Sequence, residues 1–382
     1  MSPKEFVVVG GGISGLAAAH RLAELSREKR GSCRITLLEA SPRFGGLIET
    51  RMEAGFLLES GPDSFLCENP WALDLCRRLG LEEEVIQTHE KLRRSFVVHG
   101  DSLSLKPAAL QPGDIERWYA GGSRYGHMLS LKRGLRQLVE ALVQKMPEVT
   151  LRRSSPVSRI ERRERWVIVL HNRGESLPAD AVCIALPAAK AAIVLSSGAP
   201  ELNKELNAIP HESVATVNVA FRKGDVAHPL DGFGFVVPAI ERRRILGATF
   251  SSVKFPDRAP EAAVLIRAFV GGAFHRELVD LDDAAMKQMV VEELRRMLGV
   301  HGEPILVSIR RHPQAMPQYE LGHLARVAAI EEQAARYPGL YLTGNAYRGV
   351  GIPDCIHQAE MVAERMVENH RHPERSEGSH EV

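Results

Sequence analysis

Glycines, rather than acids or nucleophiles, are the first residues of this chain whose spacing could support chemistry. Residues 5–22 read EFVVVGGGISGLAAAHRL, so that Gly10, Gly12 and Gly15 stand in the spacing G-x-G-x-x-G between a run of β-formers and a helical pattern. In such a unit the first glycine makes the turn, the second admits a pyrophosphate to the backbone, and the third lets helix and strand pack closely. The N–H groups of Ile13 and Ser14 would then face the phosphates. The pattern predicts a dinucleotide site, with an ordinary strand-to-helix turn as the alternative.

An acidic residue follows at the distance that such a site requires. The run CRITLLEA predicts a second strand that ends at Glu39. A carboxylate there can accept hydrogen bonds from ribose hydroxyls and would repel a 2′-phosphate. The sequence therefore predicts NAD or FAD rather than NADP.

A second group of glycines lies near the other end of the chain, where residues 343–355 read TGNAYRGVGIPDC. They separate the apolar run 340–342 from the helical pattern of residues 356–367. Glycine lets the backbone approach a ligand closely, so Gly344, Gly349 and Gly351 indicate that something lies against this loop. A tight connection with glycine at positive φ is the alternative.

The composition of the whole chain is typical of a globular protein, and its length suits two domains. The chain has 382 residues, of which 44% are hydrophobic and 25% are charged. A net charge of +1 argues against a nucleic-acid partner, which would call for a clustered basic surplus. The most apolar window, residues 181–200, contains Pro187 and Lys190 and falls short of a membrane-spanning segment.

Cysteine and histidine usage points to the inside of a cell and away from a metal site. The five cysteines are odd in number and form no C-x-x-C pair, which favours reduced thiols. The histidines show neither zinc-binding spacing nor H-E-x-x-H, so we expect no metal. The first apolar run is too short for a secretion signal, which predicts a cytoplasmic protein, although a peripheral attachment to the membrane would leave no such mark.

The stretch EASPRFGGLIET resembles the fingerprint of the FAD-binding amine-oxidase superfamily, in which a glutamate, an arginine and a glycine pair occur in this order. The resemblance implies FAD, with Arg43 near its pyrophosphate; a surface cation is the alternative for Arg43. It also implies that the C-terminal strand, glycine loop and helix pack on the flavin and its ribityl-phosphate arm. Many relatives carry Gly-Asp where this chain has Gly344-Asn345, so the ribityl contact would come from an amide.

Within the superfamily, five stretches resemble the bacterial porphyrinogen oxidases: GFLLESGPDSF at 55–65, DGFGFVVP at 231–238, FPDRAP at 255–260, AMPQYELGH at 315–323 and GNAYRGVGIPDC at 344–355. The resemblance implies oxidation of protoporphyrinogen IX or coproporphyrinogen III to the porphyrin in haem biosynthesis, with hydride passing to flavin N5 and oxygen as acceptor. Two alternatives stay open: a flavin amine oxidase or desaturase with another substrate, and a catalytically impaired protein that binds FAD and porphyrin.

The residues that the motif and the resemblance together assign to FAD cluster at the two glycine loops and at three segments between them. They are Gly10, Gly12, Ile13, Ser14, Gly15, Glu39, Arg43, Gly45, Gly46, Gly61, Pro62, Asp63, Val157, Gly344, Asn345, Gly351, Ile352 and Pro353.

The expected fold is α/β with mixed α+β character: a Rossmann-like FAD-binding domain, discontinuous in sequence, with an inserted mixed-sheet substrate-binding domain. Short β-rich runs at 214–221, 233–238, 244–252 and 263–272 predict the mixed sheet. Leu131, Leu135, Leu138 and Leu142 stand at helical spacing. The predicted FAD-binding segments are 1–92, 130–190 and 335–369, the substrate-binding segments are 93–129 and 191–334, and residues 370–382 are a disordered tail.

One departure from the resemblance concerns the cover of the pocket. Family members place a long helical segment, which covers the substrate and attaches to the membrane, where this chain has only residues 106–127. Its prolines and glycines predict a loop with one helical turn around residues 115–119. Trp118 and Tyr119 are expected to anchor this loop; the alternative is that they cap the pocket. Most of the covering domain is therefore expected to be missing, which leaves membrane association weak or absent.

The substrate's propionates require a cation, and the resemblance implies Arg94 in the stretch RRSFVVHG. Arg93 is the close competitor, and a solvated charge at a strand edge is the alternative. A guanidinium suits a carboxylate because it can bind in a bidentate way. No pattern in the sequence indicates the oligomeric state.

Overall fold

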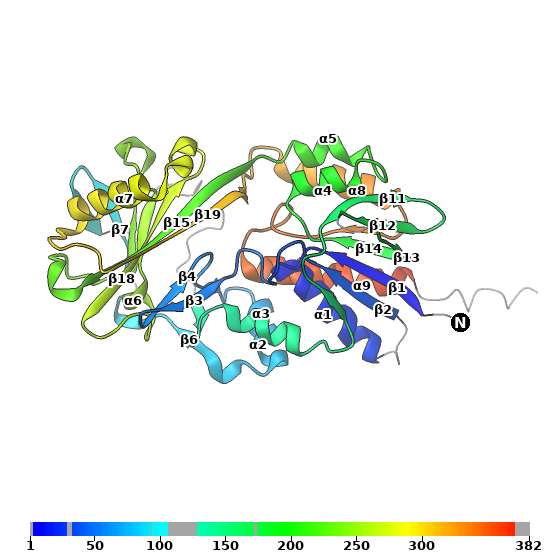
Figure 1. Ribbon diagram of the computed structural model, residues 1–382, viewed down its shortest axis with the longest axis horizontal. Helices are drawn as coiled ribbons and strands as arrows, with labels where there is room; N and C mark the ends of the chain where they lie inside the picture. The colour runs from blue at the N-terminus through cyan, green and yellow to red at the C-terminus, as the bar shows by residue number, and fades with distance from the viewer. Residues whose placement is uncertain (1–2, 29–32, 93, 106–127, 172–173, 371–382) are drawn as a thin grey trace, which may run out of the picture.

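The computed structural model describes residues 3–28, 33–92, 94–105, 128–171 and 174–370 (Figure 1). Two halves lie side by side along its long axis, with both ends of the chain in one half and the middle of the chain in the other. The loop at 106–127 with Trp118 and Tyr119, the competitor Arg93 and residues 371–382 of the predicted tail lie outside the described residues.

The first half is built on a five-stranded parallel sheet in the order β10-β2-β1-β14-β20. Nearly continuous apolar runs form these strands, as expected for a parallel sheet covered on both faces. Phe6 of β1 lies between Ile35 of β2 and Ala181 of β14. The strands are β1 (Lys4–Val9), β2 (Cys33–Leu38), β10 (Thr150–Arg152), β14 (Ala181–Ile184) and β20 (Leu340–Leu342).

Helices from both ends of the chain cover one face of this sheet. Leu16 and Leu22 of α1 pack with Ile356 and Ala363 of α9 in a single core that also holds Leu138. The chain closes this layer only when its last helix is in place. The helices are α1 (Ile13–Glu28), α2 (Trp71–Leu79), α3 (Arg136–Gln144) and α9 (Ile352–Asn369).

The other face carries a three-stranded antiparallel sheet, β11-β12-β13, together with three helices. Trp166, Leu202 and Ile330 share one core with Val182 of the parallel sheet. The segment predicted for substrate binding, 191–334, therefore divides between two cores, because its first and last helices pack on the nucleotide half. These elements are β11 (Val157–Arg162), β12 (Trp166–Leu170), β13 (Ser176–Ala179), α4 (Ala188–Leu195), α5 (Leu202–Asn207) and α8 (His323–Ala335).

The second half is a seven-stranded mixed sheet in the order β19-β15-β18-β17-β16-β7-β8. The four predicted β-rich runs form β15 to β18, which confirms them. The strands β15 and β19 are long and connect the two halves (Figure 1). The strands are β7 (Phe96–His99), β8 (Ser102–Leu105), β15 (His211–Arg222), β16 (Gly234–Val236), β17 (Gly247–Phe250), β18 (Ala263–Gly271) and β19 (Leu306–Pro317).

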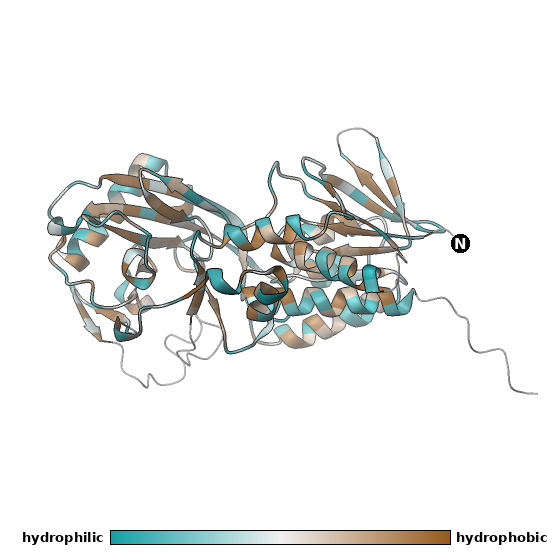
Figure 2. Cartoon of the chain, turned by 90° about the horizontal axis from the view of Figure 1, so that it is seen from below, coloured by the Kyte–Doolittle hydropathy of each residue, from teal (hydrophilic) through white to brown (hydrophobic). Residues whose placement is uncertain are grey.

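Helix α7 (Asp283–Leu298) covers one face of the seven-stranded sheet, where Met286 and Leu294 pack against Val217 and Ile266. Asp282 caps this helix by accepting a hydrogen bond from Ala285 N at 2.8 Å. Figure 2 shows the strands of both sheets mainly in brown and the helices with teal on their outer sides, as expected when the sheets are buried and the helices cover them.

Short elements join the halves on the opposite face. Hairpin β3 (Thr50–Glu53) and β4 (Phe56–Glu59) places Phe56 and Leu58 against Leu265 of β18. A small sheet contains β5 (Phe65–Leu66), β6 (Val85–Gln87) and β9 (Met128–Leu131). The remaining short helices are α6 (Ser251–Lys254), η1 (Glu82–Glu84), η2 (Glu90–Leu92), η3 (Lys223–Asp225), η4 (Ala239–Glu241) and η5 (Arg276–Asp280).

The helical spacing from Leu131 to Leu142 was wrong at its first member. Leu131 ends β9, and helix α3 begins only at Arg136. Gly134 between them has φ +83°, and a Cβ there would come within 2.3 Å of the Thr50 side chain. The turn at this glycine, which spacing alone does not reveal, breaks the helical pattern. Among the described residues, no helix is both long and apolar enough to cross a membrane.

Candidate functional site

The N-terminal glycine loop contains two glycines that the protein itself requires. A Cβ on Gly10 would lie 2.3 Å from Ala185 O, and one on Gly15 would lie 1.8 Å from Gly10 O. Gly10 also has φ +109°, where other residues are strained. These two positions hold helix α1 close to strands β1 and β14, as the spacing predicts.

Gly12 differs from both, because a Cβ there would meet nothing closer than Gly46 Cα at 3.9 Å. The space beside Gly12 is therefore open among the described residues, while its neighbours are tightly packed. The first N–H groups of an α helix have no partner within the helix, and those of α1 begin at Ile13, next to this space. An anion beside Gly12 would receive those hydrogen bonds and the positive end of the helix dipole.

Glu39 follows the last residue of β2 and is hydrogen-bonded to this loop. Its Oε2 accepts a hydrogen bond from Gly11 N at 2.7 Å, and its Oε1 accepts one from Ser41 N at 2.7 Å. An ionised carboxylate has about four lone-pair sites, so two backbone donors leave room for ribose hydroxyls. Ser155 N donates to Glu39 O at 2.9 Å, which brings the loop before Val157 to the same edge.

The segment after Glu39 folds back onto the first glycine loop. Gly45 N donates to Gly11 O at 2.8 Å, and Gly46 lies against Gly12. The Arg43 guanidinium donates to Gly46 O at 2.7 Å and to Ile48 O at 3.0 Å, so it holds this segment in shape. Burial lowers the pKa of Arg43 from its ordinary value, against the nearby Glu49 carboxylate.

The C-terminal loop meets the same place from the other side. Gly344 has φ +133°, and a Cβ there would find nothing closer than Leu186 O at 3.9 Å. Next to it, the Thr343 hydroxyl is buried without a hydrogen-bond partner among the described residues. The Cys355 thiol in α9 donates to Gly349 O at 3.9 Å, and helix α9 packs against α1 in the same core.

Tyr319 and His323 hold the C-terminal loop in position. The Tyr319 hydroxyl donates to Asn345 O at 2.7 Å and accepts from Gly349 N at 2.9 Å. The His323 ring stacks on Tyr319 with centroids 3.9 Å apart, and its Nε2 lies 2.8 Å from Tyr347 O. Gly351, Ile352 and Pro353 then begin α9, with Asp354 accepting from Gly351 N. The resemblance pointed to the stretch that contains Tyr319 but not to this role.

The predicted segment Gly61, Pro62 and Asp63 lies at the junction of the two halves. The carbonyl groups of residues 59–61 accept hydrogen bonds from Asn218 at 3.1 Å, Thr216 at 2.6 Å and Arg267 at 2.7 Å. These three donors stand on β15 and β18, so this segment ties the substrate sheet to the nucleotide half.

Asp63 is buried between two cations. Its Oδ1 lies 3.0 Å from Lys254 Nζ, and its Oδ2 lies 3.2 Å from Arg267 Nη2. Burial alone would raise the pKa of Asp63, but the charges of Arg267 and Lys254 outweigh it and hold that pKa well below its usual range. Sequence reasoning missed Lys254 and Arg267, which stand among β-formers far from residue 63 and carry no motif of their own.

Arg94 comes shortly before β7, a strand near the opposite end of the seven-stranded sheet from β19. Its guanidinium is hydrogen-bonded and ion-paired to Asp231, and 43% of the side chain is exposed. The structure thus brings the two glycine loops, Glu39 and residues 43–46 together, places residues 61–63 at the junction of the halves, and leaves Arg94 apart from both.

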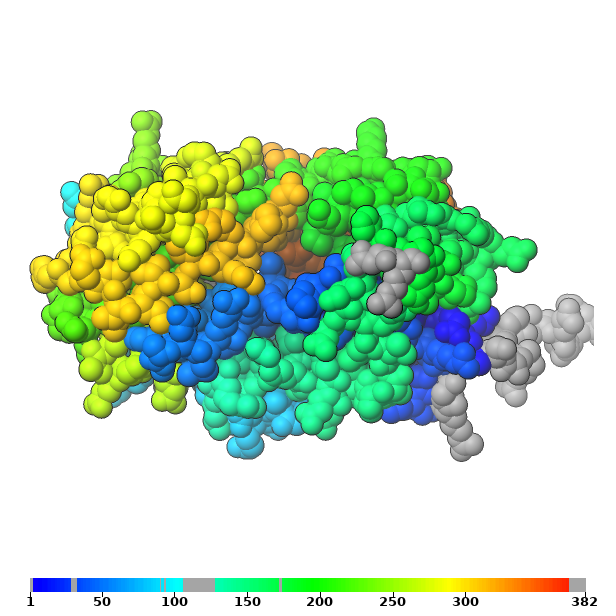
Figure 3. All heavy atoms as spheres, viewed as in Figure 1, coloured from blue at the N-terminus to red at the C-terminus, as the bar shows by residue number. Residues whose placement is uncertain are grey.

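A cleft of about 430 Å³ opens between the halves. Figure 3 shows a hollow there, between the blue N-terminal segments and the orange strand β19. The residues that line it are basic or apolar: Arg43, Leu47, Ile309, Arg310, Arg311, His312, Pro313 and Ala315. Sequence reasoning named only Arg43 among them.

Comparisons with known proteins match the chain along most of its length. The profile of the family described as "Flavin containing amine oxidoreductase" matches residues 13–122 and 113–367. Coproporphyrinogen III oxidase of Bacillus subtilis (strain 168) is 29% identical over 461 residues, which cover 94% of this chain and 96% of the relative. Protoporphyrinogen oxidase 2, chloroplastic/mitochondrial, of Arabidopsis thaliana is 25% identical over an alignment that covers 93% of this chain and 92% of that relative.

A solved structure from Exiguobacterium sp. 255-15, described as "Putative protoporphyrinogen oxidase", superposes with a TM-score of 0.83 at 27% identity over 96% of this chain and 100% of that one. The alignment with the B. subtilis relative is 461 residues long, whereas this chain has 382. That relative therefore contains segments without a counterpart here, in agreement with the predicted shortening.

Proposed function

Because the chain belongs to the flavin containing amine oxidoreductase family, we propose that it binds FAD and oxidises a porphyrinogen to the porphyrin in haem biosynthesis. The observation that carries the proposal is the near full-length similarity to relatives named coproporphyrinogen III oxidase and protoporphyrinogen oxidase. The substrate is protoporphyrinogen IX or coproporphyrinogen III, oxygen is the acceptor, and the enzyme acts in the cytoplasm.

The open space beside Gly12 and Gly344 fits such a cofactor, since neither position meets a protein atom closer than 3.9 Å. Glu39 would hold the adenosine ribose, the first turn of α1 the pyrophosphate, and the loop from Gly344 to Pro353 the flavin with its ribityl arm. When bound, the flavin supplies the hydride acceptor and the route for electrons to the final acceptor.

The protein's own part in the reaction is to bind and orient. Glu39 and Asp63, the acidic members of the predicted set, are both engaged with protein donors. The described lining of the cleft consists of arginine, histidine and apolar side chains, which suits an apolar substrate body with acidic arms. The chain therefore contributes positioning and partial exclusion of water rather than a nucleophile.

The predicted substrate contact of Arg94 remains part of the proposal. Arg94→Ala should raise KM for a porphyrinogen and leave FAD bound. We expect only a small increase in KM, because the guanidinium is already paired with Asp231 in a partly exposed setting. Asp231→Ala, which frees the guanidinium, serves as the matched variant. An unchanged KM in Arg94→Ala would remove this residue from the substrate site.

Aerobic turnover of the purified flavoprotein tests the proposal directly. Protoporphyrinogen IX and coproporphyrinogen III are supplied in parallel, and porphyrin fluorescence is followed against a flavin-free control. We expect fluorescence to grow faster than autoxidation, and the faster substrate identifies the physiological one. No growth with FAD fully bound would contradict the proposal.

The shortened chain keeps two alternatives in view, because the B. subtilis relative contains segments that are absent here. A catalytically impaired FAD- and porphyrin-binding protein would quench its flavin fluorescence with protoporphyrin but show no turnover. A flavin amine oxidase would instead be bleached by polyamines under anaerobic conditions. The same purified protein serves all three measurements.

A further inference from the structure

The cleft between the halves carries a surplus of positive charge. Arg43, Arg51 and Arg310 surround Glu49, whose side chain is 9% exposed. Arg51 Nη2 lies 2.8 Å from Glu49 Oε1, while Arg310 and Arg43 lie 3.0 Å and 3.7 Å from Oε2. One carboxylate compensates one guanidinium, so the group as a whole attracts anions.

The three arginines differ in what their N–H groups do. Arg43 donates to three backbone carbonyls of residues 44–48, and Arg51 donates twice to Glu49 Oε1. Arg310, among the described residues, has the ion pair with Glu49 Oε2 and no hydrogen bond, and Glu49 Oε2 itself accepts none. The Arg310 side chain is 41% exposed. Its donors therefore remain for a ligand.

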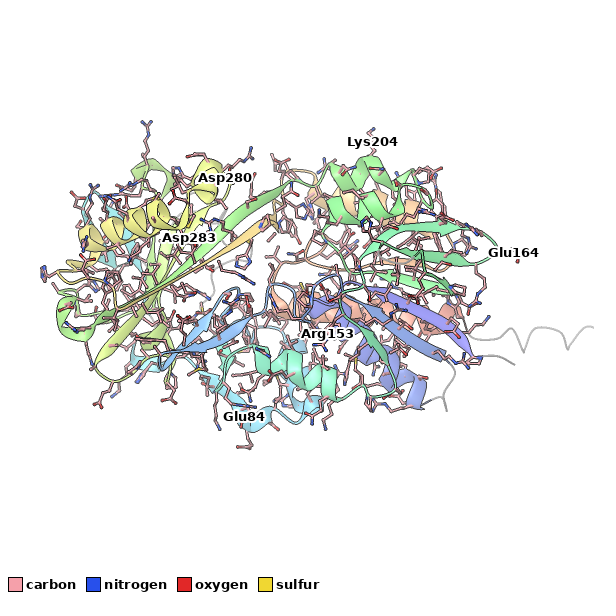
Figure 4. All side chains as sticks on the ribbon, in the orientation of Figure 1. Glu84, Arg153, Glu164, Lys204, Asp280 and Asp283 are labelled. Atoms are coloured by element: carbon pink, nitrogen blue, oxygen red, sulfur yellow. The ribbon has the colours of Figure 1, made fainter. Side chains whose placement is uncertain are left out.

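The direction of Arg310 follows from its place on β19. Successive side chains of a strand point to opposite faces. Arg311 points to the α7 side, where it donates to Val279 O at 2.9 Å and to Asp283 Oδ1 at 2.6 Å. Asp283, labelled in Figure 4, is the first residue of α7, the helix that covers this face of the sheet. Arg310 accordingly points to the opposite face, together with His312, whose Nε2 lies 2.7 Å from Ser60 O.

The walls beside Arg310 are apolar. Leu47, Pro313 and Ala315 line the same cleft, and Leu47 is 38% exposed. Pro313 and Ala315 stand at the register shift that interrupts the alternation of β19. A guanidinium with free donors beside such walls suits a ligand with an apolar body and an acidic arm. A fully hydrated inorganic anion would leave the apolar walls without a partner.

We propose that Arg310 binds a carboxylate arm of the substrate and determines specificity for acidic tetrapyrroles. This inference rests on the proposed function, and it names the group at that site that recognises the substrate. Arg310 can bind the carboxylate through two parallel N–H groups while Glu49 keeps its other edge oriented.

Steady-state kinetics of Arg310→Gln test the proposal. We expect KM for the preferred porphyrinogen to rise roughly tenfold or more with kcat little changed, because the carboxylate contact exists before and during the reaction. Arg310→Lys keeps the charge but loses the planar guanidinium, so its KM should lie between those of the unmodified chain and Arg310→Gln. Arg222→Gln removes an exposed arginine at the end of β15 in the same sheet and is the control.

The flavin content of each variant distinguishes substrate from cofactor. Arg310→Gln should retain the flavin absorbance per protein of the unmodified chain. Loss of FAD from this variant would overturn the proposal, because the guanidinium would then belong to the cofactor site. An unchanged KM with full flavin would overturn it as well.

A binding measurement separates this inference from the proposed function. Coproporphyrin III and its tetramethyl ester are titrated against the flavoprotein by fluorescence quenching. The unmodified chain should bind the acid more tightly than the ester, and Arg310→Gln should lose that preference. If the unmodified chain shows no turnover, the proposed function fails while this comparison still decides the role of Arg310. If both proteins prefer the acid over the ester to the same extent, the proposed role of Arg310 is refuted.

Discussion

The proposed cofactor cradle (residues 10–15, 39–46 and 343–353) and the junction (residues 59–63 with Thr216, Asn218, Lys254 and Arg267) are built by opposite means. In the cradle, glycines leave space beside Gly12 and Gly344, and the available donors are backbone N–H groups. In the junction, charged side chains fill the space and Asp63 is fully enclosed by cations. We infer that changes in the cradle act mainly on ligand binding, whereas changes in the junction act mainly on folding.

Removing the junction's central charge should have the largest effect. Asp63→Asn leaves Lys254 and Arg267 buried without their carboxylate, and breaking a buried pair from one side costs about 3–5 kcal/mol. We expect the free energy of unfolding in urea to fall by about this amount. Asp231→Asn, which breaks the partly exposed pair with Arg94, should cost below about 1 kcal/mol. Equal losses in the two variants would contradict the contrast between buried and exposed pairs.

Glu59 should make the junction sensitive to pH. Burial raises its pKa to about 7 from an ordinary value of 4.5, against hydrogen bonds from Leu135 N and Thr50. Because the folded-state pKa is raised, protonated Glu59 stabilises the folded protein. This stabilisation is complete below pH 4.5 and is lost as the pH rises through 7. The loss is about 3 kcal/mol at most.

Glu59→Gln should therefore flatten the dependence of stability on pH over this window. The measurement is urea unfolding at a series of pH values from 4.5 to 7.5. Glu53→Gln, at the exposed end of β3, is the control. A Glu59→Gln protein with the same slope as the unmodified chain would show that another group titrates.

Two alanine substitutions sharpen the description of the cradle. Gly15→Ala drives a Cβ to 1.8 Å from Gly10 O and should destabilise the apoprotein by about 1–3 kcal/mol or more. Gly12→Ala meets no protein atom within 3.9 Å, so the apoprotein should keep its Tm while FAD binding weakens. Thermal unfolding and FAD titration of both apoproteins provide the check, and a matching loss of Tm in Gly12→Ala would refute the open cradle.

The smallest effect is expected at the support of the C-terminal loop. Tyr319→Phe removes the hydroxyl that bonds Asn345 O and Gly349 N but keeps the ring on His323. Two hydrogen bonds of about 1 kcal/mol each predict a Kd for FAD that is tenfold or more higher, with the fold intact. Tyr341→Phe, whose hydroxyl accepts from Asn369, is the control. An unchanged FAD affinity would show that the loop keeps its shape without Tyr319.

The geometry of the proposed cradle was predictable from the sequence because its parts are local. Gly10, Gly12 and Gly15 stand within six consecutive residues, and Glu39 follows directly after the next strand, so spacing alone brings them near each other. The β-rich runs of the substrate sheet were equally visible, because each strand is a short run of β-formers bounded by turn or charged residues. The one false step, at Leu131, came from a turn glycine inside an apparently helical spacing.

The junction and the basic cleft were not readable, because each joins residues that are far apart in the chain. Asp63 meets Lys254 and Arg267 across two domains, and Glu49 meets Arg310 in the same way. Each partner alone resembles any charged residue in a strand or loop. Such pairs become predictable only when the register of β18 and β19 is known, since one residue more or less turns the side chain to the opposite face.

The strand order of the parallel sheet bears on how the protein is made. Strand β1 pairs with β14, β14 pairs with β20, and α9 packs against α1, so the nucleotide half needs the last-synthesised segments of the chain. During synthesis, the first strands of this half lack their later partners until the whole substrate sheet has left the ribosome. Contacts of such long sequence separation fold slowly and expose unpaired strand edges meanwhile. The yield of the protein in a cell should therefore depend on chaperones and on the rate of translation.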